Sequence, residues 1–195
     1  MFLRNRLSSA ILEKMDFLIA PLRPTQIMSH DREILERTIL PYLASTCQSV
    51  LFVGCAKYTK GYNKLFERQE YWTIDCMESR AKYGSKRHIR GDITQLSRHF
   101  EKNYLDVIIM NGVLGWGVDT DEEISRALEE CRIVLKPGGL LILGWNDFIP
   151  IFSKRLGEIL SSNQGFRAFD FPGLNTSEYH SIGRGHVFSF LRKPA

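Results

Sequence analysis

The chain has 195 residues, of which 44% are hydrophobic and 11% aromatic, so it can bury a core and is not intrinsically disordered. Its net charge of +4 comes from basic residues scattered among acidic ones, which does not favour a dedicated nucleic-acid-binding protein. No apolar run approaches the roughly 18 residues that a membrane-spanning helix needs.

Residues 1–24 carry apolar side chains at helical spacing, and Pro21 and Pro24 end this pattern. We expect residues 1–28 to form an N-terminal helical extension or lid, either packed on the domain or covering a pocket, and residues 29–195 to form one domain. Ser29 is expected to cap the first helix of that domain, and Pro41 is expected to bend or break it.

From residue 49 onward, short apolar runs alternate with helical segments. Strands are predicted over residues 50–53, 71–74, 107–110 and 140–143, with a further short element that closes at Gly91 and Asp92. Such continuously apolar strands are typical of a parallel sheet covered on both faces by helices. Before the last of these strands, Thr120 and Glu123 form a predicted capping box, and the turn over residues 136–139 ends that helix.

The C-terminal third predicts a helix over residues 151–160 and alternating strands over 166–171 and 187–191. Because no helix separates these two strands, they must pair antiparallel. The predicted fold class is therefore α/β: a Rossmann-like, doubly wound, mostly parallel sheet with a C-terminal antiparallel hairpin.

The cysteines do not form the spacings typical of a metal site or of a disulfide framework; they are Cys47, Cys55, Cys76 and Cys131. The N-terminal segment also lacks the pattern of a secretory signal. We therefore expect no bound metal, and we expect a reduced, cytoplasmic protein.

Ligands of a doubly wound sheet bind where its parallel strands end. The predicted strands end in residues suited to such a site, namely Gly54, Asp75, Asp92 and Asn111. Asp75 follows Gly54 by 21 residues, close to the roughly 20-residue spacing at which an acid meets a nucleoside ribose. The dinucleotide fingerprint, the P-loop and the commonest hydrolase motifs are absent, which disfavours those three classes of enzyme.

Residues 47–147 resemble the class I S-adenosylmethionine-dependent methyltransferases, in particular methyltransferase type 11-like domains. Residues 50–58 are similar to the first motif of that family, with a degenerate glycine pattern. Residues 106–114 are similar to its fourth motif, and residues 135–141 to the turn into its fifth strand. The late antiparallel hairpin matches the topology of the family.

The resemblance implies that residues 29–195 bind S-adenosylmethionine as cofactor. Asp75 would accept both ribose hydroxyls, Asp92 and the backbone of Ile93 would meet the adenine, and Asn111 would lie beneath the sulfonium. The implied cofactor-binding residues are Gly54, Cys55, Ala56, Tyr58, Asp75, Cys76, Met77, Asp92, Ile93, Asn111 and Gly112.

The first motif departs from the family at three positions. Phe52 stands where an acid is usual, which removes a partner for the ammonium group of the cofactor. Either the affinity for the cofactor falls or another residue supplies that contact. Ala56 and Tyr58 stand where the family has glycine-rich spacing, so the bulky Tyr58 must either point away or take part in binding.

Further candidates surround the expected cleft. The candidate catalytic residues are His180, Asp147 and Asn146, and the candidate substrate-binding residues are Trp116, Trp145 and Tyr179. Asp119 and His186 lie at the same edge. Histidine has the ordinary pKa best suited to a general base. The alternatives are a helix cap for Asp147, an exposed loop position for His180, and core packing for the two tryptophans.

These patterns predict an enzyme that transfers a methyl group from S-adenosylmethionine to oxygen or nitrogen of a small-molecule acceptor, because little chain remains for a separate recognition domain. The alternative is a non-catalytic or repurposed member of the fold that binds the cofactor or a protein partner. Phe52, Ala56 and Tyr58 motivate that alternative.

Overall fold

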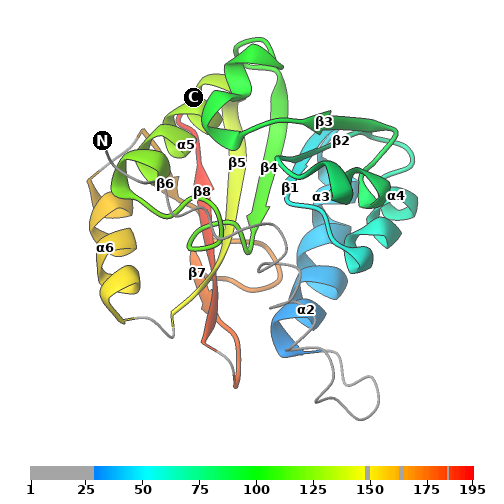
Figure 1. Cartoon of the computed structure of the whole chain (residues 1–195). Helices are drawn as coiled ribbons and strands as arrows, with labels where there is room; N and C mark the ends of the chain where they lie inside the picture. The colour runs from blue at the N-terminus through cyan, green and yellow to red at the C-terminus, as the bar shows by residue number, and fades with distance from the viewer. Residues whose placement is uncertain (1–28, 148–149, 163–164, 184) are drawn as a thin grey trace.

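A computed structural model describes residues 29–147, 150–162, 165–183 and 185–195. The predicted extension over residues 1–28 lies outside them. One eight-stranded sheet runs through the molecule in the order β3-β2-β1-β4-β5-β8-β6, and β7 also pairs with β8 (Figure 1). The strands are β1 (Ser49–Val53), β2 (Glu70–Asp75), β3 (Arg87–Arg90), β4 (Leu105–Asn111), β5 (Leu135–Asn146), β6 (Arg167–Ala168), β7 (Glu178–His180) and β8 (His186–Arg192).

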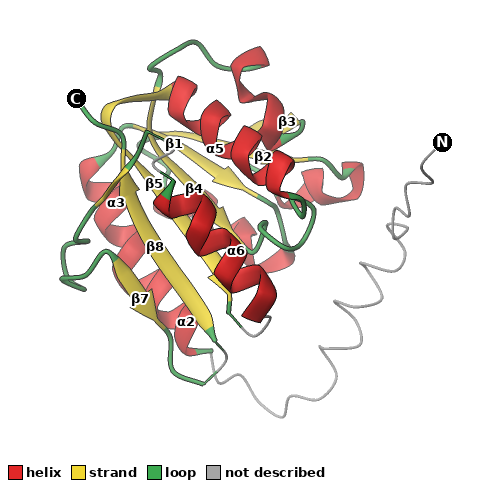
Figure 2. Cartoon of the chain, turned by 90° about the vertical axis from the view of Figure 1, so that its left-hand side faces the viewer, coloured by secondary structure: helices red, strands yellow, loops and turns green. Residues whose placement is uncertain are grey.

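The first five strands are parallel to one another, whereas β8 runs antiparallel to β5 and also pairs antiparallel with β6 and β7. This arrangement confirms the predicted doubly wound sheet with an antiparallel C-terminal part. In Figure 2, α5 and α6 lie in front of the sheet, with α2 and α3 behind it. The helical elements are α2 (His30–Ile34), η2 (Leu35–Ile39), α3 (Leu40–Thr46), η3 (Lys57–Gly61), α4 (Tyr62–Leu65), η4 (Glu78–Tyr83), η5 (Ile93–Arg98), α5 (Asp121–Val134) and α6 (Pro150–Ser161).

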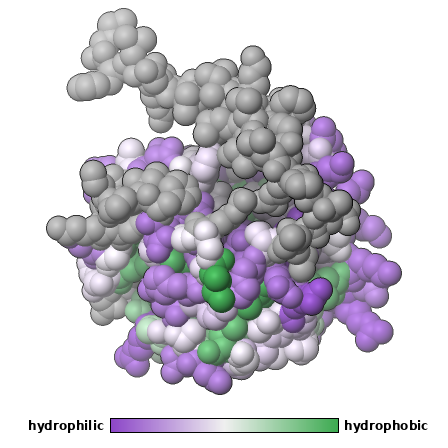
Figure 3. Space-filling view, turned by 90° about the horizontal axis from the view of Figure 1, so that it is seen from below, coloured by the Kyte–Doolittle hydropathy of each residue, from purple (hydrophilic) through white to green (hydrophobic). Residues whose placement is uncertain are grey.

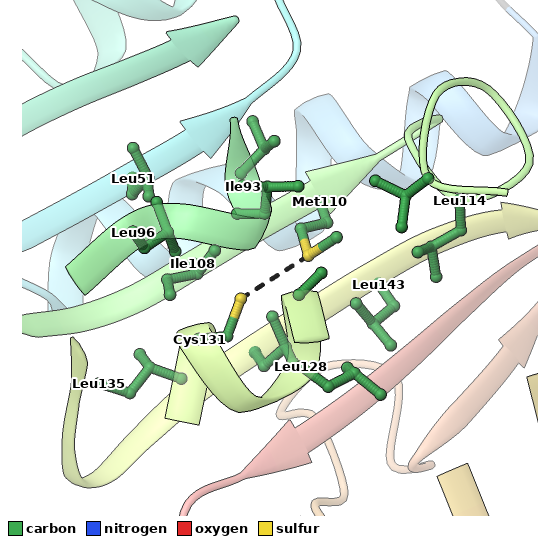
Figure 4. Close-up of a cluster of buried hydrophobic side chains, with 14 of the residues drawn as sticks. Leu51, Ile93, Leu96, Ile108, Met110, Leu114, Leu128, Cys131, Leu135 and Leu143 are labelled. Carbon is green, nitrogen blue, oxygen red and sulfur yellow. Dashed lines mark hydrogen bonds between the residues drawn. The ribbon is translucent and has the colours of Figure 1, made fainter. Parts of the chain in front are cut away.

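Each face of the sheet has its own hydrophobic core, because successive side chains of a strand point to opposite faces. On β1, Leu51 and Val53 belong to the core under α5, η5 and α6, whereas Val50 and Phe52 belong to the core under η2, α3 and α4. Figure 4 shows the first of these cores, where Cys131 of α5 meets Met110 of β4. Burial raises the pKa of the Cys131 thiol, so this cysteine packs as a neutral, apolar group.

The first described helix runs from α2 through η2 into α3, so Pro41, which was expected to bend or break it, does not break it. Its regular hydrogen-bond ladder is interrupted instead by a π-helical stretch, η2, just before the proline. Ser29 holds the N-cap position, but only its backbone carbonyl takes part, accepting from the backbone of Glu33 at 2.9 Å. Ser29 therefore holds the predicted cap position, although its side chain makes no capping hydrogen bond.

The turn over residues 136–139 falls inside β5 rather than before it. Leu105 of β4 pairs with Leu135, and Val107 pairs next with Leu140, so the turn bulges out between two paired stretches of β5. The capping box at the start of α5 is confirmed, since the hydroxyl of Thr120 accepts from the backbone of Glu123 at 3.2 Å.

The strand predicted over residues 166–171 is much shorter than expected. Only β6, of two residues, pairs with β8, and Pro172 with Gly173 turns the chain after Phe171. Phe171 nevertheless reaches the core, where its ring stacks on Phe190 at 4.6 Å between centroids. The alternating pattern of residues 166–171 thus indicates which side chains are buried, and it does not indicate strand pairing. The segment β7, which does pair with β8, lies between the two predicted strands, where a loop was expected.

Candidate active site

The order of the strands reverses between β1 and β4. The chain passes from β1 outward to β2 and β3 on one side, and from β4 to β5 on the other. Such a reversal leaves a crevice at the carboxyl ends of the two central strands. Gly54 follows β1 and Asn111 ends β4, so both predicted residues lie at this crevice. In Figure 1, β4 points downward, and Figure 3 views the molecule from below, where a small hydrophobic patch lies among hydrophilic residues.

Asp75, at the end of β2, joins the loop that follows β1 to the loop that follows β2. Its Oδ2 accepts from the backbone N–H of Cys55 at 2.7 Å, and its Oδ1 accepts from that of Met77 at 2.8 Å. Gly54 makes the first contact possible by adopting a φ of +82°, which favours glycine. Each carboxylate oxygen can accept a second hydrogen bond. The geometry therefore fits the two ribose hydroxyls that the resemblance assigns to Asp75.

The residues assigned to the adenine have mixed environments. Asp92 is exposed, and its Oδ1 accepts from both the backbone and the hydroxyl of Thr94 at 2.8 Å, so it also caps η5. Ile93 is buried in the core, which leaves only its backbone to meet a ligand. Cys76 is exposed and Met77 half-buried beside Asp75. The exposed Gly112, after β4, has a φ of +70°.

A cavity of about 230 Å³ lies beside α2 and the end of β4. We call it the α2 cavity; its lining residues are Ser29, Asp31, Arg32, Leu35, Tyr58, Asn111 and Phe188. Tyr58 does not point away from the site but lines this cavity, with the guanidinium of Arg32 4.8 Å from its ring centroid. Two predicted residues, Tyr58 and Asn111, thus share the α2 cavity with a helix that the sequence had not connected to the site.

The loop after β1 uses its own backbone groups. The backbone N–H of Ala56 donates to the hydroxyl of Thr59 at 3.1 Å, while that of Cys55 donates to Asp75. Burial, together with the charge of Asp75, raises the pKa of Cys55 to about 11. Its thiol is therefore neutral at pH 7 and is not suited to nucleophilic chemistry.

Phe52, at the position of the usual acid, is buried and packs edge-on against Tyr62, with 5.4 Å between ring centroids. The hydroxyl of Tyr62 donates to Glu36 at 2.9 Å, and Nε of Arg32 donates to the same carboxylate oxygen at 2.7 Å. An apolar contact of Phe52 thus stands where the family usually has an acidic side chain on β1. The charged groups near Tyr62 belong to the helix formed by α2 and η2.

His186 lies between the side chains that end β4 and β5. It is only 6% exposed, with Nε2 3.1 Å from the carboxamide of Asn111 and Nδ1 2.9 Å from that of Asn146. Burial lowers the pKa of His186, against the opposing charges of Asp31 and Asp147, so the ring is neutral at pH 7. A neutral imidazole has one donor and one acceptor. One carboxamide therefore presents its NH₂ group to the ring and the other its oxygen.

The other candidate residues near the acceptor, His180 and Tyr179, do not line the α2 cavity. The side chain of His180 is 60% exposed; its Nε2 lies 2.8 Å from Glu178, and its Nδ1 lies 3.8 Å from Asp147. Tyr179 stacks on His30, with 6.1 Å between ring centroids. His180 is a predicted catalytic residue, whereas His186 was expected only to lie at the same edge of the sheet. The alternation along β8 was the available signal for the burial of His186.

The two candidate tryptophans have different environments. Trp145 is buried in the core, where Nε1 donates to the hydroxyl of Ser189 at 3.0 Å, so its polar group is already satisfied. Trp116 is 42% exposed in the loop between β4 and α5, between two glycines of positive φ, Gly115 and Gly117. Of the two, only Trp116 is available to contact an acceptor.

The buried His186 should make stability depend on pH. Below about pH 6.5 the unfolded chain binds a proton at this histidine while the folded chain does not, so stability falls on acidification, by at most about 1.4 kcal/mol per pH unit. His186→Gln lacks this contribution. The difference in unfolding free energy between the wild type and this variant should therefore shrink from pH 7.5 to pH 5. Urea unfolding at several pH values measures it.

His180→Gln is the matched control, because it also removes one histidine, but from an exposed position. It retains the buried His186, so its stability should still fall on acidification. A wild type and a His186→Gln variant that lose stability in parallel would contradict the assignment of a neutral, buried His186.

Residues 29–147, 150–162, 165–183 and 185–195 contain no group of three or more histidine, cysteine, aspartate or glutamate side chains that could hold a metal ion. Over the same described ranges, no helix has both the length and the apolar character required to cross a membrane.

Residues 51–143 match the sequence model of a protein family that is described as a methyltransferase domain. None of the curated proteins with which the chain was compared matches it in sequence.

Solved structures share the fold. The N-methyltransferase NodS from Bradyrhizobium japonicum WM9, in complex with S-adenosyl-L-homocysteine, has a TM-score of 0.65 and 18% identity, over 94% of this chain and 98% of NodS. The 1,6-didemethyltoxoflavin-N1-methyltransferase from Burkholderia thailandensis has a TM-score of 0.55 and 15% identity, over 95% of this chain and 89% of that one. An rRNA methylase from Streptococcus thermophilus has a TM-score of 0.57 and 15% identity, over 88% of this chain and 100% of the methylase.

At these identities the solved structures establish the fold and leave the acceptor open. The strand order, the switch-point residues and the matched family agree with one another. The described chain has the fold of the class I methyltransferases, the fold whose cofactor is S-adenosylmethionine, and residues 51–143 match the methyltransferase domain.

Proposed function

We propose that this protein transfers the methyl group of S-adenosylmethionine to oxygen or nitrogen of a small-molecule acceptor. The observation that carries the proposal is the geometry near the switch point, where the backbone of Cys55 and Met77 holds the Asp75 carboxylate and the α2 cavity lies at the end of β4. Asp75 would bind the ribose, and Asn111 would lie where the reacting groups meet.

The cofactor supplies a methyl carbon already activated by a positively charged sulfur. In the transfer, a lone pair of the acceptor forms a bond to that carbon while the carbon–sulfur bond breaks and its electron pair stays on sulfur. The protein must therefore align donor and acceptor and exclude water. Asn111, fixed by the neutral His186, provides a rigid wall for that alignment, and the exposed Trp116 provides an apolar surface for the acceptor.

A base is needed only where the acceptor must lose a proton. His180 and Asp147, 3.8 Å apart, are the proposed proton acceptors, and Tyr179 is the proposed substrate contact next to them. Asn146 would act through His186, which it contacts at 2.9 Å. The ring of His186 is enclosed by the two carboxamides, so we assign it to positioning.

A small acceptor is favoured by the way basic residues are scattered among acidic ones along the sequence, which is not the pattern of a dedicated nucleic-acid-binding protein. The Burkholderia enzyme, with 1,6-didemethyltoxoflavin and S-adenosylhomocysteine bound, is an example of this fold with a small acceptor. The Streptococcus rRNA methylase is an example with RNA.

Titration calorimetry with S-adenosylmethionine and S-adenosylhomocysteine tests the first step. Incubation with methyl-labelled cofactor, and either a small-molecule fraction or an RNA fraction of a cell extract, tests the second. Label in small molecules would support the proposal, whereas label in RNA alone would overturn the acceptor class. Binding without transfer to either fraction would favour a repurposed, non-catalytic member of the fold. Absence of binding by folded protein would overturn the proposal itself.

A further inference from the structure

The α2 cavity carries charges of both signs. Asp31 and Arg32, two successive residues of α2, line it together with the hydroxyl-bearing Ser29 and the carboxamide of Asn111. A cavity that offers one carboxylate and one guanidinium is complementary to a ligand that carries both an ammonium and a carboxylate. Such a zwitterion is the amino-acid end of S-adenosylmethionine and of its demethylated product.

The guanidinium of Arg32 is held in place from two sides. Its Nε donates to Glu36 at 2.7 Å, and its Cζ lies 4.8 Å from the centroid of the Tyr58 ring. Glu36 in turn accepts from the hydroxyl of Tyr62 at 2.9 Å, which fixes the carboxylate. Because the bond to Glu36 uses Nε, the two terminal nitrogens of Arg32 can still donate to a carboxylate. Fixing the side chain beforehand lowers the entropy lost on binding.

Asp31 has a different environment. Its side chain is half-buried on the cavity wall, and its negative charge acts on the neighbouring His186. Within residues 29–147, 150–162, 165–183 and 185–195, no hydrogen bond or ion pair to its carboxylate is observed. A half-buried carboxylate of this kind gains stability when a cation supplies hydrogen bonds to it.

The first strand lacks the acid that would otherwise provide such a charge. Phe52 occupies that position, buried against Tyr62, so no carboxylate from β1 reaches the crevice. We propose that Asp31 and Arg32 of α2 together bind the zwitterionic amino-acid end of the cofactor, with Asp31 accepting from its ammonium and Arg32 donating to its carboxylate. This inference rests on the proposed function, and it relocates the charged contact from the sheet to the preceding helix.

Two ligands separate this role from the rest of the site. S-adenosylhomocysteine carries the amino-acid end, and 5′-methylthioadenosine has the same adenosine and sulfur without it. By calorimetry on the full chain, Asp31→Asn should weaken the binding of S-adenosylhomocysteine by about 10-fold or more, because it removes one charge-assisted contact. The affinity for 5′-methylthioadenosine should stay within about 2-fold of the wild-type value.

Glu33→Gln is the matched control. It removes one negative charge from the same helix, but Glu33 pairs with the exposed Arg37 at 3.1 Å and does not line the cavity. This variant should bind both ligands as the wild type does. Arg32→Gln provides a second variant, which should also weaken S-adenosylhomocysteine selectively.

The possible failures are distinguishable. Unchanged binding of S-adenosylhomocysteine by Asp31→Asn, in a protein whose Asp75→Ala variant loses both ligands, would overturn this inference and leave the proposed function intact. If Asp31→Asn weakened the binding of both ligands equally, the inference would also be overturned, because Asp31 would then support the structure of the whole site and not contact the amino-acid end. A wild type that binds neither ligand would overturn the inference and the proposed function together.

Discussion

Replacing Asp75 with alanine should weaken the binding of S-adenosylhomocysteine by about 100-fold or more. Two charge-assisted hydrogen bonds to the ribose would be lost, each contributing about 1.5–3 kcal/mol. The substitution also frees the backbone N–H groups of Cys55 and Met77, which the carboxylate holds at 2.7 and 2.8 Å, so the loop after β1 loses its anchor. Titration calorimetry with both S-adenosylhomocysteine and 5′-methylthioadenosine measures the effect, which should apply equally to the two ligands.

Two other variants sharpen this prediction. Asp75→Asn keeps the shape of the side chain but has one acceptor oxygen instead of two, so its affinity should lie between those of the wild type and the alanine variant. Glu78→Gln removes a nearby exposed acid that pairs with Arg90 at 2.8 Å, and it should bind as the wild type does. An Asp75→Ala protein that retains its fold and the wild-type affinity would show that the ribose is bound elsewhere.

Replacing Gly144 with alanine should lower the free energy of unfolding by about 3 kcal/mol and also weaken the cofactor site. A Cβ atom at this position of β5 would overlap with the carboxamide of Asn111 and lie 3.0 Å from Nε2 of His186. Asn111 would have to turn away, which breaks its contact with the buried ring and leaves polar groups without partners. Because Asn111 also lines the α2 cavity, affinity for S-adenosylhomocysteine should fall with stability.

Gly61→Ala is the control for this substitution. An added Cβ at Gly61 meets no atom within 4 Å, and the residue has a φ of −64°, which alanine adopts freely. Its stability should equal or slightly exceed that of the wild type, because alanine has less conformational freedom in the unfolded chain. Urea unfolding of the three proteins side by side measures the difference. A Gly144→Ala variant as stable as Gly61→Ala would mean that Asn111 and His186 are not packed against β5.

The elements that sequence predicted best are those with a local cause. Thr120 and Glu123 are three residues apart, and their reciprocal hydrogen bonds follow from helix geometry alone. The central strands were identifiable because a strand buried on both faces must be apolar throughout. The elements predicted worst are those that depend on a partner, such as β7, whose three residues pair with β8 without any strong pattern of their own.

For the candidate site, the spacing between Gly54 and Asp75 placed one glycine and one acid at neighbouring strand ends, and the structure brings them together through the backbone of Cys55. Their proximity follows from chain order, since consecutive parallel strands of such a sheet end at the same edge. His186 could not be ranked above His180 in this way, because its burial depends on Asn111 and Asn146, which are 75 and 40 residues distant.

Local patterns in the sequence were sufficient to predict the class of sheet and the residues at the ends of its first strands, because periodicity, capping and strand-end position act over a few residues. The lining of one cavity by Asp31, Arg32, Tyr58 and Asn111 became visible only in the folded chain, as did the burial of Trp145 and the exposure of Trp116. These outcomes depend on which helix covers which face of the sheet. That packing is set by the summed burial of two separate cores, a long-range property that no local pattern contains.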